Sequence, residues 1–311
     1  MNEVRDIFVS VIMITYKHEQ FIAKAIEGIL MQKCDFEVEL IIADDCSPDK
    51  TEEKVFQIIK NHPKNSWIKY TKHKTNKGMI SNFIWALNQA QGKYIALCEG
   101  DDYWIDPLKL QKQVDFLEAN QEYSMCFHKV DYVDELNDII EFEDYNKDTK
   151  TTTTFEDLCK SNYINTCSNL FRNNELITNW PSALADCFPG DWVLNLLMCG
   201  KNGLIYMLEE KMASYRIHSQ GIWSKQKKDA KKLELISTSK YKVYKYFDKN
   251  KTLKRTLSIG FIRLSNQAFI EKKYGLYLRS KIKAIYYFQL RKDNIKELIA
   301  DFLFPNIIKN R

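Results

Sequence analysis

The sequence predicts an α/β fold, with a mostly parallel central sheet flanked by helices and a helical C-terminal extension. Two observations carry this prediction. Four short predicted strands alternate with three amphipathic segments over residues 8–98, which is the pattern of a doubly wound parallel sheet. From about Lys225 onward, lysines alternate with Leu, Ile, Tyr and Phe at helical spacing, and Gly and Pro are scarce.

Four strands are predicted, and all but the third, at 67–71, are apolar runs with the length and composition of buried strands. The four strands are residues 8–15, 38–43, 67–71 and 94–98. The segment after Phe21 has apolar residues in adjacent i, i+4 rows and predicts the first helix. Asp49 and Glu52 have capping-box spacing at the start of the second helix, and Gly92 is the expected end of the third.

The rest of the chain predicts further elements with weaker signals. They are a helix at 107–118, a strand at 124–130, an irregular acidic loop at 131–150, a strand at 165–172, a helix starting at Asp191 and a last strand at 203–207. For residues 225–311 we expect two to four basic amphipathic helices.

The net charge of +5 conceals an asymmetry between two parts of the chain. Residues 225–311 hold 23 Lys and Arg against 7 Asp and Glu, whereas residues 1–224 hold 23 against 34. Such a basic region suits an anionic membrane surface, a solvated helical face or an oligomer contact. We expect no nucleic-acid partner, because the sequence contains no recognisable nucleic-acid-binding motif.

The eight cysteines include no CxxC pair and several lie in apolar runs, so we expect reduced core thiols without disulfides or a zinc site.

The N-terminus lacks the pattern of a signal peptide, and no stretch approaches the ~18 apolar residues that span a bilayer. We therefore expect a cytoplasmic protein, peripheral on the inner face of the plasma membrane if the basic region docks there.

An acidic turn follows the fourth predicted strand. Glu99, Asp101 and Asp102 come directly after that apolar run, and Gly100 between them allows close approach of the backbone. Carboxylates at this position are costly unless a positive charge lies among them, and open α/β sheets bind ligands at the carboxyl ends of their strands. We therefore predict a divalent cation that carries a phosphorylated ligand; the alternative is a solvated acidic turn. Neither GxGxxG after the first strand nor GxxxxGK[ST] occurs, which disfavours dinucleotide dehydrogenases and P-loop NTPases.

Four motifs follow the four predicted strands in order. They are Thr15-Tyr16, Asp44-Asp45 with Ser47, Asn76-Lys77-Gly78 and Glu99-Gly100-Asp101-Asp102. Together they resemble the inverting family 2 glycosyltransferases of GT-A fold, over about residues 7–220 and most strongly over 7–118. The resemblance implies a GT-A catalytic domain at 1–224, with a nucleotide-sugar-binding half at 1–118 and an acceptor-binding half at 119–224.

The resemblance also implies which residues bind the nucleotide-sugar. They are Thr15, Tyr16, Glu19, Asp44, Asp45, Asn76, Lys77, Gly78, Glu99, Asp101 and Asp102. Within this set, Asp44 would accept a hydrogen bond from the base, most simply from uracil N3–H, and Asp45 would brace its loop. The acidic turn occupies the place of the family's DxD motif, with Asp101 as the metal ligand.

Two further residues complete the implied chemistry. Asp191 stands where the family has its catalytic base, and the alternative is an acid that merely favours the start of a helix. His218 matches a histidine in a Tyr-Arg-x-His segment that binds the metal in some members, and the alternative is a surface loop histidine. The cation would be Mn²⁺ or Mg²⁺, and one imidazole ligand favours Mn²⁺. No functional role is predicted for the remaining histidines, His18, His62, His73 and His128.

Aromatic faces suit sugars, so Trp104, Trp192 and Trp223 are candidates to line the sugar or acceptor sites, with core packing as the alternative.

The sequence also departs from the family pattern. Lys17 stands where many members have Asn, and Glu99 replaces the first Asp of DxD. Neither a QxxRW motif nor a membrane span is present, which disfavours processive synthases.

The implied function is metal-dependent transfer of one hexosyl or N-acetylhexosaminyl group from a nucleotide-sugar, most simply a UDP-sugar, with inversion. The acceptor would be a glycan or a lipid-linked oligosaccharide in cell-surface polysaccharide synthesis. The alternatives are a polyprenyl-phosphate sugar synthase and a non-catalytic sugar-nucleotide-binding or scaffold protein. A sugar-1-phosphate nucleotidyltransferase is disfavoured because its Gly-rich N-terminal loop is missing.

Overall fold

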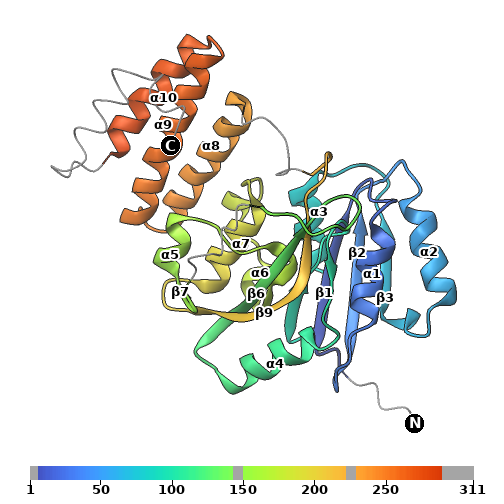
Figure 1. Ribbon diagram of the computed structural model, residues 1–311. Coiled ribbons are helices and arrows are strands. Elements are labelled where there is room, and N and C mark those ends of the chain that lie inside the picture. The colour runs from blue at the N-terminus through green and yellow to red at the C-terminus, as the bar shows by residue number, and fades with distance from the viewer. Residues whose placement is uncertain (1–5, 143–149, 222–228, 289–311) are drawn as a thin grey trace. The chain divides into compact units, whose positions relative to one another are not determined.

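The computed structural model describes residues 6–142, 150–221 and 229–288. The chain divides into two compact units, Met1–Asp186 with Gly190–Gln226 and Cys187–Pro189 with Lys227–Arg311. In the described residues the first unit contains one sheet with helices around it, and the second is helical (Figure 1).

Four parallel strands form one side of the sheet in the order β3-β2-β1-β4 (Figure 1). These strands are β1 (Val9–Thr15), β2 (Val38–Asp44), β3 (Ile68–Lys72) and β4 (Tyr94–Leu97), and the helices between them are α1 (Ile22–Leu30), α2 (Thr51–Asn61) and α3 (Met79–Leu87). Every residue of β1, β2 and β4 is buried, as their continuous apolar runs predict. The predicted alternation of strand and helix is confirmed, and the loops that follow these parallel strands emerge at one edge of the sheet.

Beyond β4 the sheet is mixed. The elements here are β5 (Tyr103–Trp104), α4 (Lys109–Ala119), β6 (Tyr123–Val133), β7 (Thr152–Thr154), α5 (Phe155–Lys160), β8 (Leu170–Arg172), α6 (Glu175–Thr178), α7 (Gly190–Cys199) and β9 (Leu204–Arg216), with short 3-10 helices η1 (Asn65–Trp67), η2 (Thr166–Ser168) and η3 (Ser182–Leu184). Strand β8 lies antiparallel between β4 and β6. Strand β9 runs parallel to β6 and antiparallel to β5 and β7, which brings the end of β9 beside the acidic turn.

Two predicted boundary signals act differently in the structure. The capping box of Asp49 and Glu52 does not form: Asp49 Oδ1 accepts a hydrogen bond from the Thr51 amide (3.1 Å), whereas Glu52 Oε2 accepts from Lys72 Nζ (2.9 Å). Both carboxylates are therefore drawn to other partners. The strand predicted at 165–172 is shortened to β8, because η2 occupies its first part.

Other boundaries differ because of packing between elements. Gly92 does not end α3, which stops at Leu87. Gly92 lies against β1, where an added Cβ would come 2.6 Å from the Ser10 nitrogen. The strand predicted at 203–207 continues to Arg216, since pairing with β6 extends along its whole length.

The segment predicted as an irregular acidic loop, 131–150, begins inside β6, and Val133 forms an isolated bridge with Ile139. Residues 143–149 and Trp223 lie outside the described residues.

The second unit contains three helices in its described part, within the predicted two to four. They are α8 (Ala230–Tyr246), α9 (Lys251–Ile270) and α10 (Tyr274–Tyr287). Asp229 caps α8 by accepting a hydrogen bond from the Lys232 amide (2.8 Å), and Asn250 caps α9 through the Thr252 amide (2.8 Å). No helix in the described segments combines the length and apolarity needed to cross a membrane.

Candidate functional site

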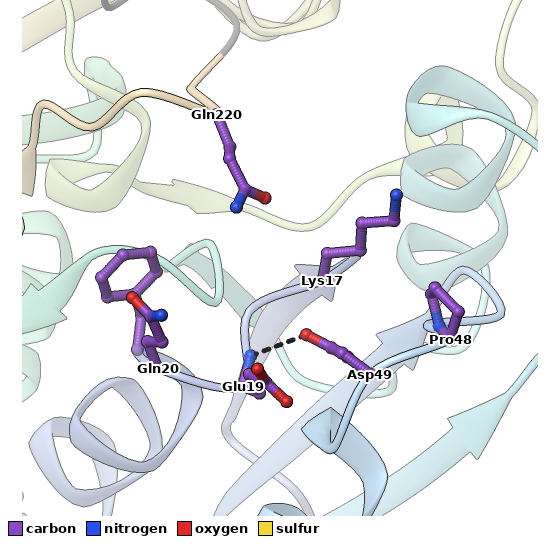
Figure 2. Close-up of a pocket in the computed structure, with 7 residues that line it drawn as sticks. Lys17, Glu19, Gln20, Pro48, Asp49 and Gln220 are labelled. Atoms are coloured by element: carbon purple, nitrogen blue, oxygen red, sulfur yellow. Dashed lines mark hydrogen bonds between the residues drawn. The ribbon is translucent and has the colours of Figure 1, made fainter.

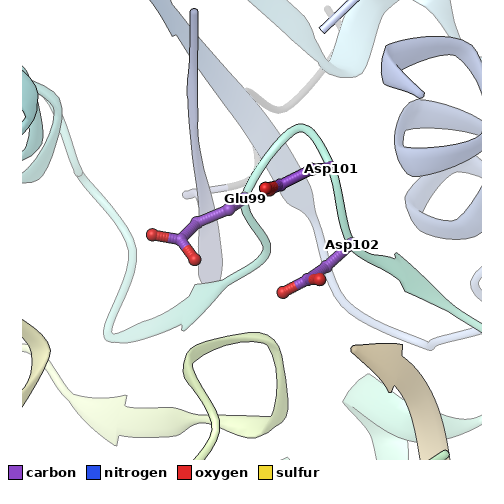
Figure 3. Close-up of side chains that lie close together, drawn as sticks. All are labelled: Glu99, Asp101 and Asp102. Carbon is purple, nitrogen blue, oxygen red and sulfur yellow. The ribbon is translucent and has the colours of Figure 1, made fainter. Parts of the chain in front are cut away.

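The acidic turn after β4 gathers three carboxylates. Glu99, Asp101 and Asp102 each place an oxygen within 4.8 Å of the others (Figure 3). Gly100 is required at the centre of the turn, because a Cβ there would come 2.8 Å from Thr15 Oγ1. The Gly100 amide donates to a backbone carbonyl of β1 (3.0 Å), which holds the turn against the end of that strand.

Arg216, the last residue of β9, fixes the turn from the other side. Its amide donates to Asp102 Oδ1 (2.8 Å) and its Nε donates to the backbone carbonyl of Asp101 (2.8 Å). Sequence reasoning does not single out Arg216, although the Tyr-Arg-x-His segment that identifies His218 contains it. The extension of β9 beyond its predicted end is therefore what brings Arg216 and His218 to the site.

Two histidines flank the Asp101 carboxylate. His218 Nε2 lies 3.0 Å from Asp101 Oδ2, and His18 Nε2 lies 3.8 Å from the same oxygen. His218 is buried, so the surface-loop alternative is wrong. His18, for which no role is predicted, reaches the site because the loop after β1 and the acidic turn meet at the same sheet edge. The only signal for it in the sequence is its position next to the Thr15-Tyr16 motif.

Burial and neighbouring charges set the protonation of this cluster. Burial raises the pKa of Glu99 well above its ordinary range, and the other carboxylates of the turn and Asp191 raise it further. Burial also raises the pKa of Asp102, and the Asp101 charge adds to the effect. For Asp101 itself burial opposes ionisation, but the two flanking histidines outweigh it and lower the pKa. Asp101 is thus the carboxylate of the turn that stays ionised most readily, and Asp191 acts on the turn through its charge.

The turn fits a divalent cation. Repulsion among three clustered carboxylates is relieved when a cation lies between them. Carboxylate oxygens are the donors that Mg²⁺ and Mn²⁺ prefer, and the imidazole of His218 beside Asp101 adds a donor that suits Mn²⁺. Asp101 and His218 are therefore suitably placed ligands, with Glu99 within reach of the same point.

The loops after β1 and β2 are joined by hydrogen bonds. The Lys17 amide donates to Ser47 Oγ (3.0 Å), and the Glu19 amide donates to Asp49 Oδ2 (3.1 Å). The Lys50 amide in turn donates to Glu19 Oε2 (2.9 Å). A pocket with a volume of about 210 Å³ lies beside these loops (Figure 2). Its lining residues are Lys17, Glu19, Gln20, Phe21, Pro48, Asp49 and Gln220.

The predicted nucleotide residues of the first loop differ in accessibility. Thr15 is buried at the end of β1, whereas the Tyr16 ring is 40% exposed. Lys17 adopts a positive φ of 62° and places its Nζ 5.2 Å from the centre of the Tyr16 ring. Tyr16 and Glu19 are thus available beside the pocket, although one Glu19 oxygen is already used by the second loop.

Asp44 is fully buried and holds its own turn. Its Oδ1 accepts from the Ser47 amide (2.7 Å) and its Oδ2 accepts from the Tyr70 hydroxyl (2.8 Å). Burial raises the pKa of Tyr70, and the bond to Asp44 adds to the effect. The contact of Asp44 with a nucleotide base stays a prediction, since both of its oxygens already accept hydrogen bonds from the protein.

Asp45 holds the loop that carries the third motif. Its Oδ1 accepts from the Lys77 amide (2.6 Å) and its Oδ2 from the Gly78 amide (2.9 Å). Asn76 Nδ2 donates to the Asp45 carbonyl (3.0 Å). Gly78 has a φ of +84°, a conformation that favours glycine. Asp45, Asn76, Lys77 and Gly78 therefore form one rigid corner at the sheet edge.

Asp191 lies in the first turn of α7 and is hydrogen-bonded to the half-buried Asn162, which continues into the buried Asn195 and Asn169. Its Oδ2 accepts from Asn162 Nδ2 (2.7 Å), Asn162 Oδ1 accepts from Asn195 (3.1 Å), and Asn195 Oδ1 accepts from Asn169 (3.3 Å). Burial raises the pKa of Asp191, while the Trp192 amide and Asn162 oppose the shift. Sequence reasoning misses this row of asparagines, because its members come from three separate segments.

The tryptophans belong to the core. Trp104 is 1% exposed and its Nε1 donates to the Cys167 carbonyl (2.9 Å). Trp192 is 3% exposed and donates to the Leu158 carbonyl (2.8 Å). The candidate role of both at a sugar or acceptor site is wrong in this structure, because their faces are packed against protein.

Comparison with known sequences identifies a family. A sequence model described as "Glycosyl transferase family 2" matches residues 10–177. The uncharacterized protein Rv1520 of Mycobacterium tuberculosis is 36% identical over 230 residues, which cover 72% of this chain and 62% of that protein. This chain therefore spans less than two thirds of that relative's length. The Escherichia coli protein WfaP, named as a UDP-Glc:α-D-GlcNAc-diphosphoundecaprenol β-1,3-glucosyltransferase, is 34% identical over 128 residues, or 40% of this chain and 48% of WfaP.

Comparison with solved structures gives the same fold. The Staphylococcus aureus TarS fragment 1–349 in complex with UDP-GlcNAc matches with a TM-score of 0.67, covering 94% of this chain and 84% of TarS, at 18% sequence identity. At this identity the likeness shows the fold alone. It confirms the predicted GT-A type of α/β fold followed by C-terminal helices.

Proposed function

Because this chain belongs to glycosyl transferase family 2, we propose that it transfers one hexosyl or N-acetylhexosaminyl group from a nucleotide-sugar to an acceptor hydroxyl, with inversion at the anomeric carbon. The observation that carries the proposal is the acidic turn after β4, where three carboxylates cluster and His218 lies beside Asp101. Asp191 at the start of α7 is a further acid, and its charge raises the pKa of Glu99. Asp191 is thus available as the base, while the carboxylates of the acidic turn are suited to hold a cation that binds the diphosphate.

The proposed donor is a UDP-sugar. TarS forms complexes with UDP-GlcNAc and with UDP, and WfaP is named for UDP-Glc. The first two loops offer a half-exposed aromatic ring at Tyr16 and a polar pocket beside it. Asp45 fixes the loop of Asn76, Lys77 and Gly78 at the same edge of the sheet. These features suit the base and ribose of a nucleotide.

The residues that would hold a divalent cation are Asp101 and His218, with Glu99 nearby. When bound, such a cation supplies Lewis-acid stabilisation of the negative charge that develops on a departing diphosphate. The chain contributes the geometry: Arg216 orients Asp102 and the backbone of Asp101, and the flanking histidines keep Asp101 ionised.

Asp191 is the proposed base. A carboxylate can accept the proton of the acceptor hydroxyl as the new bond forms, and this contribution is typically worth ~10²–10⁴ in rate. The raised pKa of Asp191 makes it a stronger base than an ordinary Asp while ionised. Asn162 Nδ2 donates a hydrogen bond to Asp191 Oδ2 and so helps to orient the carboxylate. Attack by the hydroxyl opposite the leaving group gives the inverted product.

The proposed acceptor is a glycan or a lipid-linked oligosaccharide in cell-surface polysaccharide synthesis. The name of WfaP specifies a diphosphoundecaprenol-linked acceptor, which supports this class. We also propose that the basic residues of 225–311 keep the protein on the anionic inner face of a membrane.

A binding and turnover experiment on the full chain tests the proposal. UDP with Mn²⁺ should raise the melting temperature by several degrees, as expected for a ligand well above its Kd. A panel of UDP-sugars should then identify one from which UDP is released, and Asp101→Asn should lose both effects. If UDP with Mn²⁺ gives no shift, the donor proposal is wrong. Stabilisation without UDP release from any sugar in the panel would favour the non-catalytic alternative.

A further inference from the structure

Helix α10 in the second unit exposes its large apolar side chains. They are Tyr274, Leu278, Ile282, Ile285 and Tyr286, and each is between 48% and 75% exposed. Their spacing of roughly i, i+4, i+8 and i+11 places them on one side of the helix, hereafter the α10 outer face. A surface helix of a globular protein normally shows the reverse pattern, with its large apolar residues buried.

The opposite side of α10 explains how this helix is held. Ser280, Lys281 and Ala284 are buried. Ser258 Oγ on α9 donates to the Ala284 carbonyl (2.9 Å), and the Tyr287 ring stacks on Phe261 of α9 at 6.0 Å. The small side chains of Ser280 and Ala284 thus allow α10 to approach α9 closely. The outward direction of the large side chains follows from this packing.

Cations lie next to the outer face. Arg279 and Lys283 are exposed on α10, and Lys272 and Lys273 are exposed just before it. Residues 229–288 together hold 15 Lys and Arg against 4 Asp and Glu. An apolar stripe beside cations on a strongly basic unit is the composition of helices that lie in the plane of an anionic membrane.

We propose that the α10 outer face is the docking surface for an anionic lipid bilayer, with α10 lying in the plane of the interface. The inference rests on the membrane association proposed above for residues 225–311 and assigns it to one helix. Leu278 and Ile282 enter the acyl region, while Tyr274 and Tyr286, near the two ends of the stripe, lie at the headgroup level where Tyr is favoured. Arg279 contacts the anionic headgroups, whereas Lys283 Nζ lies over the Phe261 ring of α9, 5.3 Å from its centre.

A second copy of the chain is a poorer occupant of this face. A symmetric contact between two copies would present the same surface to itself. The cations of the two copies would then approach one another with few acids to offset them, since acids are scarce in this unit. A bilayer with anionic lipids supplies both the apolar phase and the opposite charge.

Vesicle sedimentation of the full chain tests the proposal. The wild type should sediment with vesicles of equimolar phosphatidylglycerol and phosphatidylcholine but not with pure phosphatidylcholine, and raised salt should weaken binding. The double variant Leu278→Ser with Ile282→Ser should lower the partition coefficient roughly tenfold to hundredfold, as expected for two large apolar side chains. The matched control, Leu136→Ser with Leu235→Ser, removes two exposed leucines elsewhere and should bind as the wild type does.

Three outcomes would overturn the inference: no binding of the wild type to anionic vesicles, equal binding of the α10 double variant and the wild type, or a wild-type dimer in sedimentation velocity that the double variant dissociates. Circular dichroism verifies that the variants remain helical. UDP release is measured on the same samples, and a loss of release with vesicle binding intact would count against the transferase proposal while leaving the docking surface in place.

Discussion

Replacement of Asp191 by Asn separates a catalytic base from an acid that only favours a helix start. Asparagine has the size of aspartate, and its amide oxygen can accept the bond that Asn162 Nδ2 now makes to Asp191 at 2.7 Å. The loss of a general base should lower turnover by ~10²–10⁴, equivalent to about 3–5 kcal/mol of activation free energy. Binding of UDP with Mn²⁺ should stay as in the wild type, because the proposed partner of Asp191 is the acceptor hydroxyl and not the nucleotide.

The effect of the same variant on stability has an opposite sign under the two hypotheses. Burial raises the pKa of Asp191 in the folded state, so its ionised form costs free energy at neutral pH, and this cost disappears only as pH falls through the raised pKa. Neutral Asn avoids that cost, and we expect an unchanged or higher melting temperature. If Asp191 only favoured the start of α7, its replacement would lose about 0.3–1 kcal/mol of interaction with the helix dipole and would lower the melting temperature.

The assay measures UDP release from the active UDP-sugar with Mn²⁺, alongside thermal melting of each variant. Glu175→Gln is the matched control, since Glu175 is an exposed acid in the first turn of another helix, α6. The control should keep turnover. Near wild-type turnover of Asp191→Asn, together with a lower melting temperature, would refute the role of Asp191 as the base.

Three further predictions concern the same site. Asn162→Ala removes a bond that lowers the pKa of Asp191, so the acid limb of the pH–rate profile should move to higher pH while the rate at alkaline pH changes much less; an unmoved limb would count against the coupling. Gly100→Ala forces a Cβ to 2.8 Å from Thr15 Oγ1 and should lower stability by about 1–3 kcal/mol with loss of donor binding, which thermal melting with and without UDP measures; normal melting would contradict the clash. Asp101→Asn should reduce UDP release by about 10² or more and remove the effect of Mn²⁺ on the melting temperature; a variant that still responds to Mn²⁺ would show that the cation lies elsewhere.

The parallel half of the fold is predictable because its signals are local. Strands β1, β2 and β4 are buried on both faces and read as continuous apolar runs, and the helix between β1 and β2 shows its period directly. The short strands β5 and β7 give no such signal, and β8 is only the end of the strand predicted at 165–172. Tyr103 and Trp104 form β5 only because Ser214 and Ala213 of β9 lie opposite them, a pairing set by tertiary structure.

The residues of the candidate site also differ in whether the sequence alone points to them. The acidic turn stands out in the sequence because its carboxylates follow a buried strand directly, whereas Asp191 is a candidate only through the resemblance to the family. His18 and Asn162 are identified in neither way, because each acquires its partner through folding: His18 approaches Asp101 across the sheet edge, and Asn162 reaches Asp191 from a segment 29 residues away. The tryptophans illustrate the converse, because an aromatic residue near a motif carries no information about which way its ring faces.

The geometry of the acidic turn also bears on how the first unit is organised. Residues 1–118 contain the turn itself, yet Asp102 Oδ1 accepts its hydrogen bond from the Arg216 amide, and Asp101 has His218 as its nearer imidazole. The Arg216 guanidinium also lies over Phe21 of the first loop, 4.6 Å from the ring centre. Without β9, the carboxylates of the turn would still repel one another. They would also lose the hydrogen bond from the Arg216 amide and the nearby imidazole of His218. Residues 1–118, the predicted nucleotide-sugar-binding half, are therefore not a self-sufficient module, because the end of β9 completes the candidate site that the first four strands begin.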